Sequence, residues 1–245
     1  MAEIFGTRRA DQLFGTDEND LIRCGRNEDY ANGGLGDDTL YGGDGNDLIE
    51  DYDGVSVIYG GRGSDRLYFS RGEAWGGLGN DQIVGGDLAV GGVGNDNLYG
   101  SGQLWGDQVP GQPEQPGGRD VLGMVTDADG VWAHGGAGRD TFQVEANGDS
   151  SAVIADFTLG VDKLLAFSNS NDTPDNRFFA LDANNDRVLD WQDSLSGGAV
   201  YTDGVNLFLG LDATVADPSS TDATCWLTLN NVTSVAAADW LFPDW

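Results

Sequence analysis

The stretch Gly33–Glu50 reads GGLGDDTLYGGDGNDLIE and contains one nine-residue phrase twice. Each copy has glycine at its first, second and fourth positions, aspartate at its sixth, and an aliphatic residue at its eighth. Glycine tolerates positive φ angles and close backbone approach, so the first six residues can form a tight turn. The last three alternate between outward and inward positions, as in a strand. One phrase therefore predicts a tight turn followed by a short strand.

Related units begin at Gly6 and continue to about residue 105, and three of them are shortened. After an insertion at about 106–117, which is rich in Pro and Gln, the pattern returns near 117 and 135. The inward position of every unit up to the insertion is aliphatic or alanine: Leu13, Ile22, Ala31, Leu40, Ile49, Ile58, Leu67, Ala74, Ile83, Ala89, Leu98 and Leu104. A flexible Gly-Asp linker would not keep such a column. Two units make one coil, and stacked coils predict an all-β fold, a parallel β-roll with strands ~4.8 Å apart.

Composition indicates which partners suit the chain. It has 245 residues, 39 glycines and a formal net charge of −29. Such self-repulsion disfavours a compact state and excludes nucleic acid as an expected partner. No stretch is long and apolar enough to span a membrane, and the start lacks the features of a secretory signal peptide. The two cysteines do not indicate a disulfide framework. An acidic chain of this kind needs cations, and its oxygen-rich groups suit calcium.

The repeated aspartate explains where those cations would bind. Stacked coils place like charges about 5 Å apart, and such pairs repel by about 1 kcal/mol in water and by more in a lower dielectric. Turn carbonyls and aspartates from two successive coils offer about six oxygens, which is what calcium accepts. The sequence therefore predicts Ca²⁺ ions, several of them, bound between coils.

The pattern GGxGxDxUx, repeated over roughly residues 6–143, resembles the repeats-in-toxin (RTX, hemolysin-type) calcium-binding family. The resemblance implies a right-handed parallel β-roll that folds on calcium after type I secretion, in a secreted, extracellular bacterial protein. The metal ligands expected in the roll are the turn glycines and aspartates Asp20, Asp29, Gly34, Gly36, Asp38, Gly43, Gly45, Asp47, Gly61, Gly63, Asp65, Gly77, Gly79, Asp81, Gly92, Gly94, Asp96, Gly136, Gly138 and Asp140.

Alternate units lie on opposite sides of the predicted roll. On the first side, with units starting at 6, 24, 42, 60, 76 and 91, every sixth position is aspartate. On the second side, with units starting at 15, 33, 51, 69, 85 and 100, only Asp20 and Asp38 are kept, and Ser56 follows. We expect a long calcium row on the first side that weakens at its start, where GTRRAD has two arginines in its turn. The second side is expected to hold calcium only near its beginning.

The outward ninth position on the second side carries a row of large side chains. Its aromatic members are Tyr41, Tyr59, Trp75 and Trp105. A row of exposed aromatics could bind sugar rings or a partner protein. The alternative is that the C-terminal segment covers the row as ordinary packing.

Residues 144–245 are expected to form a β-rich cap and secretion region. The segment Val153–Ser168 resembles the closing segment of serralysin-type proteases, which implies calcium ligands at Asp156 and Asp162; an ordinary capping hairpin is the alternative. Residues 182–193 match the ligand spacing of an EF-hand loop of the dockerin-like kind. Arg187 departs from that pattern, because glycine is usual at this sharp turn. The expected EF-hand-like ligands are Asp182, Asn184, Asp186, Val188, Asp190 and Asp193.

The last residues, from Ala238 to Phe242, resemble the C-terminal signal that type I secretion machinery reads. No HExxH or GxSxG motif is present, so the sequence predicts no catalytic site. Two functions remain open. The first is a non-enzymatic binding or adhesion protein, with a polysaccharide or cell-surface partner. The second is the calcium-binding and secretion module of a larger secreted enzyme, such as a protease, a lyase or an alginate epimerase.

Overall fold

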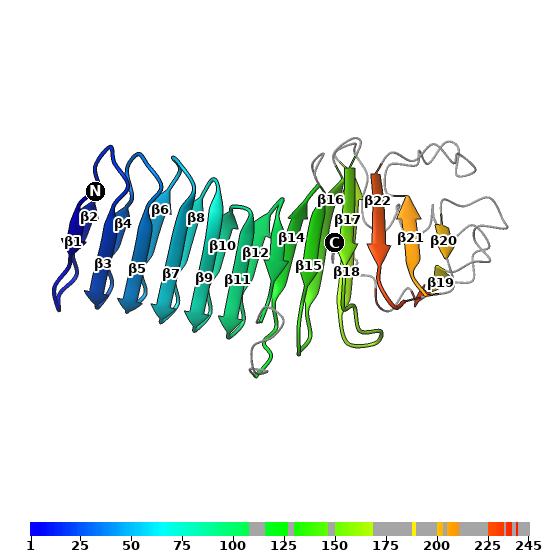
Figure 1. Ribbon diagram of the computed structural model, residues 1–245. Helices are drawn as coiled ribbons and strands as arrows, with labels where there is room; N and C mark the ends of the chain where they lie inside the picture. Colours follow the sequence, from blue (N-terminus) through cyan, green and yellow to red (C-terminus); the bar gives the residue numbers. More distant parts are fainter. Residues whose placement is uncertain are drawn as a thin grey trace. The chain divides into compact units, whose positions relative to one another are not determined.

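The computed structural model describes residues 1–107, 116–126, 130–146, 150–168, 188–189, 200–202, 205–210, 225–232, 234–236 and 239. Its regular elements are β-strands, which confirms the predicted all-β class (Figure 1). The chain divides into two compact units, Met1–Val121 and Leu122–Trp245. No helix in the described part of the chain has the length and apolar character needed to cross a membrane.

The first unit is a roll of two parallel sheets, and successive strands alternate between them. The first sheet contains β1 (Glu3–Phe5), β3 (Leu21–Arg26), β5 (Thr39–Asp44), β7 (Ser56–Arg62), β9 (Gly72–Leu78), β11 (Leu88–Val93) and β13 (Gln103–Trp105). The second sheet contains β2 (Gln12–Phe14), β4 (Tyr30–Asn32), β6 (Leu48–Asp51), β8 (Arg66–Phe69), β10 (Gln82–Gly85) and β12 (Asn97–Gly100). Each strand pairs with the strand two places along the chain, as the parallel β-roll prediction requires.

The eighth position of each unit forms the core of this roll. Strand register aligns Ile22 with Leu40, and Leu40 with Ile58, in one sheet. In the other sheet the same register aligns Ile49 with Leu67. From Ile22 to Leu104 these side chains are at most 1% exposed. Burying each such aliphatic side chain contributes about 1.5–3 kcal/mol, so the one-in-nine column supplies the hydrophobic drive for stacking.

Glycine at the second position of the turn is needed for close stacking of coils. Gly61 has a φ of +115°, and a Cβ added there would lie 2.3 Å from the Gly43 carbonyl oxygen in the preceding coil. No side chain fits that gap without a shift of the backbone. The turn glycines thus set the spacing between coils at which the aspartates meet.

The second unit continues the alternation of strands and then changes to antiparallel pairing. Its strands are β14 (Val121–Val125), which begins at the division between the units, β15 (Val131–His134), β16 (Thr141–Ala146), β17 (Ser150–Ile154), β18 (Lys163–Ser168), β19 (Val188–Leu189), β20 (Val200–Thr202), β21 (Leu207–Gly210), β22 (Cys225–Leu229) and β23 (Val235–Ala236). Parallel pairs join β15 to β17, β16 to β18 and β17 to β22. Antiparallel pairs join β22 to β21, β21 to β20 and β19 to β23.

The segment Val153–Ser168 shows how far the roll pattern extends. Its strands β17 and β18 belong to different sheets, so they do not pair with each other. The hairpin alternative is therefore wrong, and this segment has the strand–turn–strand alternation of a further coil. Parallel pairing thus passes residue 144, while the boundary at that residue stays a prediction. Antiparallel pairing of β20 with β21 shows that the chain near residue 200 no longer follows the coil pattern.

Candidate calcium-binding rows

The sixth-position aspartates of the first side are linked from coil to coil by hydrogen bonds. The backbone amide of each donates to the Oδ1 atom of the aspartate in the next coil, at 2.7–2.8 Å. The series runs through Asp11, Asp29, Asp47, Asp65, Asp81, Asp96 and Asp120. We call it the aspartate ladder. One carboxylate oxygen of each member after Asp11 is thus committed to holding two coils together.

The second oxygen of these carboxylates has a different environment. In the ladder members Asp29, Asp47, Asp65, Asp81 and Asp96 the Oδ2 atom is buried and accepts no hydrogen bond, and the same holds for Asp38 on the second side. The side chains themselves are at most 4% exposed. A buried carboxylate oxygen without a partner is costly unless a cation or a proton compensates it. The ladder therefore presents a column of oxygens with unmet demand for positive charge.

Burial has a direct effect on the acidity of the ladder. It raises the pKa of Asp65 and Asp81 to about 7, and that of Asp47 and Asp96 to about 6. Loss of hydration is the largest cause, and amide hydrogen bonds from the preceding coil act in the opposite direction. These raised pKa values are those of the protein without metal. A divalent cation would lower the pKa values of these carboxylates, because an adjacent positive charge favours the ionised form.

Backbone carbonyls converge with the second carboxylate oxygens at the first glycine of each turn. Four such glycines, Gly42, Gly60, Gly76 and Gly91, mark the place. The position of a Cβ on each would lie 2.3–2.5 Å from the Oδ2 atom of its own coil's aspartate. The same position lies 2.5–2.7 Å from a carbonyl oxygen of the next coil. Each turn therefore brings a carboxylate and a carbonyl together.

This donor set fits calcium. Carboxylate and carbonyl oxygens are the ligands that Ca²⁺ prefers. No group of three or more His, Cys, Asp or Glu side chains suited to a metal occurs in the described residues, which leaves carbonyl oxygens as necessary contributors. The turns also share one backbone form. Positive φ angles occur at all of the predicted glycine ligands, Gly34, Gly36, Gly43, Gly45, Gly61, Gly63, Gly77, Gly79, Gly92, Gly94, Gly136 and Gly138.

The comparison with known families agrees with this geometry. Residues 5–40, 25–50, 41–73 and 74–89 match the RTX calcium-binding nonapeptide repeat in four copies. These coils are RTX calcium-binding repeats. RTX repeats bind Ca²⁺ ions, so the matched coils are calcium-binding units. No curated protein matches the chain.

The amino-terminal ends of the two aspartate rows are closed by threonines. The Thr16 amide and hydroxyl donate to the Oδ2 atom of Asp20 at 2.6 and 2.8 Å. Thr7 does the same for Asp11. Both units begin with Gly-Thr where the repeat has Gly-Gly. Asp20 was predicted as a calcium ligand, and hydrogen bonds already satisfy the carboxylate oxygen that stays open in later coils.

In the second unit, Asp140 and Asp162 repeat the ladder contact. The Asp140 amide donates to Asp162 Oδ1 at 3.0 Å, and the Thr158 amide donates to Asp162 Oδ2 at 2.7 Å. The two carboxylate oxygens of Asp156 accept the amides of Gly135 and Gly136 at 3.0 and 2.8 Å. The structure thus places Asp162 in the ladder pattern and uses Asp156 to hold a turn. Their calcium contacts stay a prediction.

The EF-hand-like loop lies almost wholly outside the described residues. Only Val188 of its predicted ligands is described, and it pairs with Ala236 between β19 and β23. The predicted secretion signal is described at Asp239 alone. This carboxylate is 6% exposed, accepts the Gly160 amide at 3.0 Å and lies 3.8 Å from Lys163 Nζ. The loop and the signal both stay predictions.

Two ladder features were missed by sequence reasoning. Asp120 accepts the Asp96 amide at 2.8 Å and continues the ladder past the insertion. The only sequence signal was the short phrase GGRDVL, whose turn is two residues shorter than the repeat. On the second side, Ser56 Oγ accepts the Asp38 amide at 3.1 Å, so a serine takes the place of an aspartate.

The predicted aromatic row forms a stack of rings on the first sheet, whose strands come from the units of the second side. Tyr41 and Tyr59 have ring centroids 4.9 Å apart, and Tyr59 and Trp75 have theirs 5.0 Å apart, with nearly parallel rings. The guanidinium of Arg23 lies 5.2 Å from the Tyr41 ring centre. Buried Val90 separates Trp75 from Trp105 in the strand register. The faces of the Tyr59 ring are therefore taken up by its neighbours.

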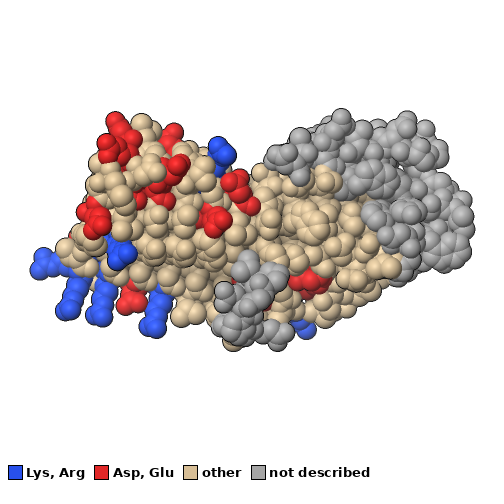
Figure 2. Space-filling model, viewed as in Figure 1, with Lys and Arg blue, Asp and Glu red and all other residues tan. Residues whose placement is uncertain are grey.

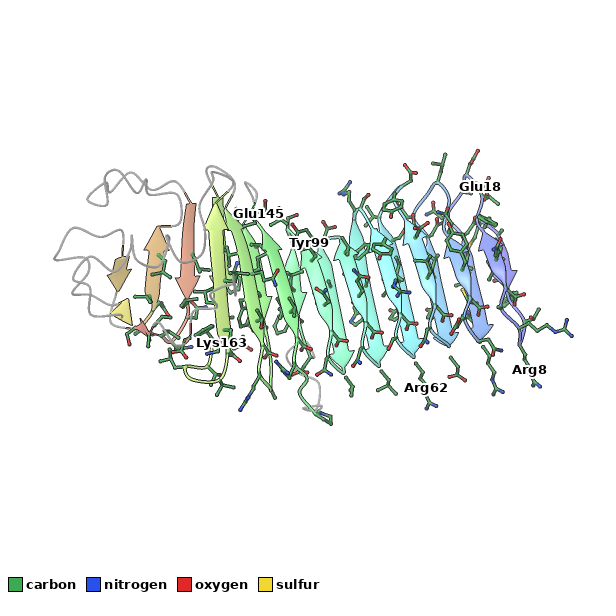
Figure 3. All side chains as sticks on the ribbon, turned by 180° about the vertical axis from the view of Figure 1, so that it is seen from behind. Arg8, Glu18, Arg62, Tyr99, Glu145 and Lys163 are labelled. Atoms are coloured by element: carbon green, nitrogen blue, oxygen red, sulfur yellow. The ribbon has the colours of Figure 1, made fainter. Side chains whose placement is uncertain are left out.

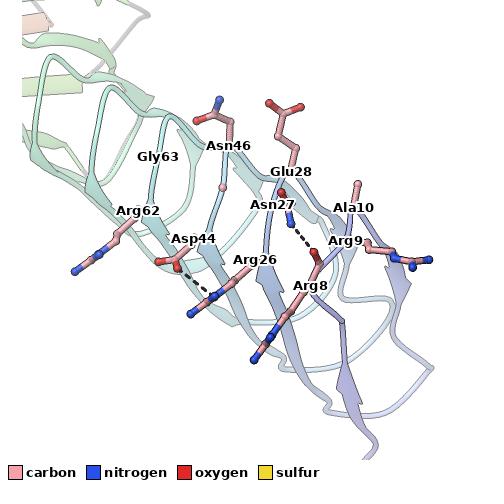
Figure 4. A pocket seen from close by; sticks show the side chains of 11 residues that line it. Arg8, Arg9, Ala10, Arg26, Asn27, Glu28, Asp44, Asn46, Arg62 and Gly63 are labelled. Carbon is pink, nitrogen blue, oxygen red and sulfur yellow. Dashed lines mark hydrogen bonds and ion pairs between the residues drawn. The ribbon is translucent and has the colours of Figure 1, made fainter.

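A recess beside the first-side turns carries basic side chains. It is lined by Arg8, Arg9, Arg26 and Arg62, together with Asp44 (Figure 4). Arg26 Nε lies 3.7 Å from Asp44 Oδ2, and both side chains are largely exposed. Figure 2 shows basic side chains projecting in a row from this unit, and Figure 3 shows Arg8 and Arg62 extending away from the ribbon. The RTX roll is a calcium-binding repeat domain rather than a catalytic one.

Proposed function

We propose that calcium acts as the folding trigger of this protein and that the folded roll works as an extracellular, non-enzymatic binding module. The observation that carries the first part is the series of buried Oδ2 atoms without hydrogen-bond partners. In low calcium, these carboxylates and the net charge of −29 oppose the compact state. In high calcium, ions bind only to the folded rows, so the binding free energy stabilises the fold.

Type I export fits this coupling. A chain that stays unfolded where calcium is scarce remains fit for translocation, and millimolar calcium outside the cell drives its folding. The test is a far-UV circular dichroism titration of the purified chain, from excess chelator into millimolar calcium, with magnesium as the control cation. We expect β structure to grow with calcium and much less with magnesium. A full β spectrum in excess chelator would falsify the proposal.

For the binding role, the best-supported surface is an apolar depression beside Trp75. It is lined by Trp75, Leu78, Val90 and Val93, with glycines of the turns completing it. Leu78 is 46% exposed. A lining of aromatic and aliphatic side chains beside turn glycines suits the apolar face of a sugar ring. Within the predicted aromatic row, Trp75 is therefore the member proposed to bind the ligand, because the ring faces of Tyr41 and Tyr59 are stacked against their neighbours.

A glycan-binding screen in calcium tests this role. We expect calcium-dependent binding to a polysaccharide that is lost in Trp75→Ala and kept in Trp132→Ala, whose ring is 49% exposed in the second unit. Binding that survives Trp75→Ala would remove the depression as the site. The module of a larger secreted enzyme stays the alternative, and no arrangement in the described residues favours it.

A further inference from the structure

One RTX unit of the second side departs from the repeat at two positions together. It reads DYDGVSVIY over residues 51–59, with Asp51 in place of the first glycine and Ser56 in place of the sixth-position aspartate. By the repeat pattern alone, this unit would not bind calcium, because Ser56 replaces the usual carboxylate. The structure gives the two departures a common explanation.

The Asp51 carboxylate is buried and unsatisfied. The residue is 2% exposed, and neither Oδ1 nor Oδ2 accepts a well-formed hydrogen bond, although the Ser56 hydroxyl and the Asp53 amide lie close enough to favour the charged form of the carboxylate. Neither Asp51 nor Asp38 takes part in an ion pair among the residues that the structure describes. The Oδ2 atom of Asp38, in the preceding coil, is likewise buried without a partner. Two buried carboxylates in this state need a cation or a shared proton.

Both unsatisfied carboxylates point to the same place. A Cβ on Gly33, the first glycine of the preceding coil, would lie 2.2 Å from Asp51 Oδ2 and 2.5 Å from Asp38 Oδ2. At Gly42, Gly60 and Gly76 on the first side, the equivalent position faces one Oδ2 atom and one backbone carbonyl of the next coil. At Gly33 a side-chain carboxylate stands where the other turns have that carbonyl. The Asp51 carbonyl itself accepts the Ser70 amide at 3.2 Å.

In this unit, Ser56 and Asp51 share the two roles that the sixth-position aspartate has in regular units. Its Oδ1 atom normally accepts the amide of the preceding coil, and Ser56 Oγ performs this task by accepting the Asp38 amide at 3.1 Å. Its second oxygen normally adds negative charge between the coils, and Asp51 supplies that charge from the opposite end of the turn. We propose that Asp51 and Asp38 together form a further calcium site, which extends the second row by one coil beyond its last repeat aspartate.

This inference rests on the proposed calcium-dependent folding, so its test must separate the two. The variant is Asp51→Asn, which keeps the size and removes the charge. The control is Asp53→Asn, the same change at an exposed carboxylate two residues away. The second variant, Asp51→Gly with Ser56→Asp, restores the regular repeat. Calcium bound per chain is counted by equilibrium dialysis, and thermal unfolding is followed with and without calcium.

We expect Asp51→Asn to bind one calcium ion fewer than the wild type, and Asp53→Asn to bind the wild-type number. The repeat-restoring double variant is expected to recover the lost ion. Without calcium, Asp51→Asn should melt at a higher temperature than the wild type, since one buried charge is gone. If Asp51→Asn does not fold, the double variant still decides. A calcium count equal to that of the wild type supports the inference, and a count one ion higher would show that the wild type lacks a site between these coils.

An unchanged calcium count in Asp51→Asn would overturn the inference and identify the pair as carboxyl groups that share a proton. Wild-type protein that binds no calcium would overturn this inference together with the proposed function. Wild-type protein that folds on calcium while Asp51→Asn keeps the full count would overturn the inference alone.

Discussion

The backbone amide of Asp65 donates a hydrogen bond to Oδ1 of Asp81 at 2.8 Å, while the Oδ2 atom of Asp81 is buried and accepts none. One carboxylate therefore does two jobs: it joins two coils and it creates the demand for a cation. Because both functions reside in one side chain, metal binding and coil stacking are coupled at each step of the roll.

Acid should partly replace calcium. The pKa values of Asp65 and Asp81 in the folded roll are about 7, against an ordinary value of 3.8, because burial disfavours the charged form. The folded state thus binds protons more tightly than the unfolded chain. Stability without metal is then highest below about pH 4 and is lost as the pH rises towards 7. We expect metal-stripped protein to gain β structure by circular dichroism between pH 8 and pH 4.5.

The matched experiment in saturating calcium should show the reverse trend, since protons compete with calcium for the same oxygens. Metal-stripped protein that loses structure on acidification would contradict the assignment of raised pKa values to the ladder.

Removing one ladder carboxylate should weaken calcium binding in the middle of the first row. Asp65→Asn keeps an oxygen for the Asp47 amide and removes the charge that faces the cation. We expect a drop of about tenfold or more in affinity at one site, by the ligand-charge dependence of calcium sites. Calorimetric titration would measure it. Asp17→Asn, at an exposed position, should leave the titration unchanged.

Gly61→Ala should destabilise the calcium-loaded roll strongly. The new methyl group would meet the Gly43 carbonyl oxygen at 2.3 Å, in addition to the strain of a φ of +115°. Gly160→Ala separates these effects, because its φ is +74° and nothing lies within 4 Å of the added atom. We expect a loss of about 1 kcal/mol for Gly160→Ala and several times that for Gly61→Ala. Equal losses in thermal unfolding would show that contact between coils is not the controlling factor.

Cys24 should report folding through its reactivity. Its side chain is fully buried, and burial raises the pKa of its thiol to about 12, with the charges of Asp47 and Asp29 as further causes. In a Cys225→Ser background, thiol labelling at pH 8 should be slow in calcium and fast in chelator. Rapid labelling in both conditions would mean that the coil around Cys24 opens without loss of metal.

Much of this structure could be predicted from the repeat, because the residues within each unit determine its local structure. Glycine spacing and the aliphatic at the eighth position specify the turn, the strand and the register, which Ile22, Leu40 and Ile58 follow. The aspartates were predicted as ligands on the basis of like-charge repulsion. Their dual use could not be predicted, because it depends on which of two oxygens faces the next coil.

The irregular units were harder to interpret, for a physical reason. Asp51 occupies a glycine position and acts through geometry that no repeat pattern describes. Thr16 satisfies the Asp20 carboxylate by folding back over four residues, a contact that pattern counting does not register. Past residue 168 the periodicity ends, and the switch to antiparallel pairing at β21 and β22 follows from contacts between distant segments.

The direction of the aspartate ladder gives the roll a polarity. Every rung donates from an earlier coil to a later one, as from Asp47 to Asp65. Strand amides also donate in the other direction, as from Leu48 to the Asp29 carbonyl, so a coil that loses either neighbour leaves donors that only water can satisfy. Each coil is therefore completed by both of its neighbours, and removing a terminal coil should destabilise the coil beside it whichever end it is taken from.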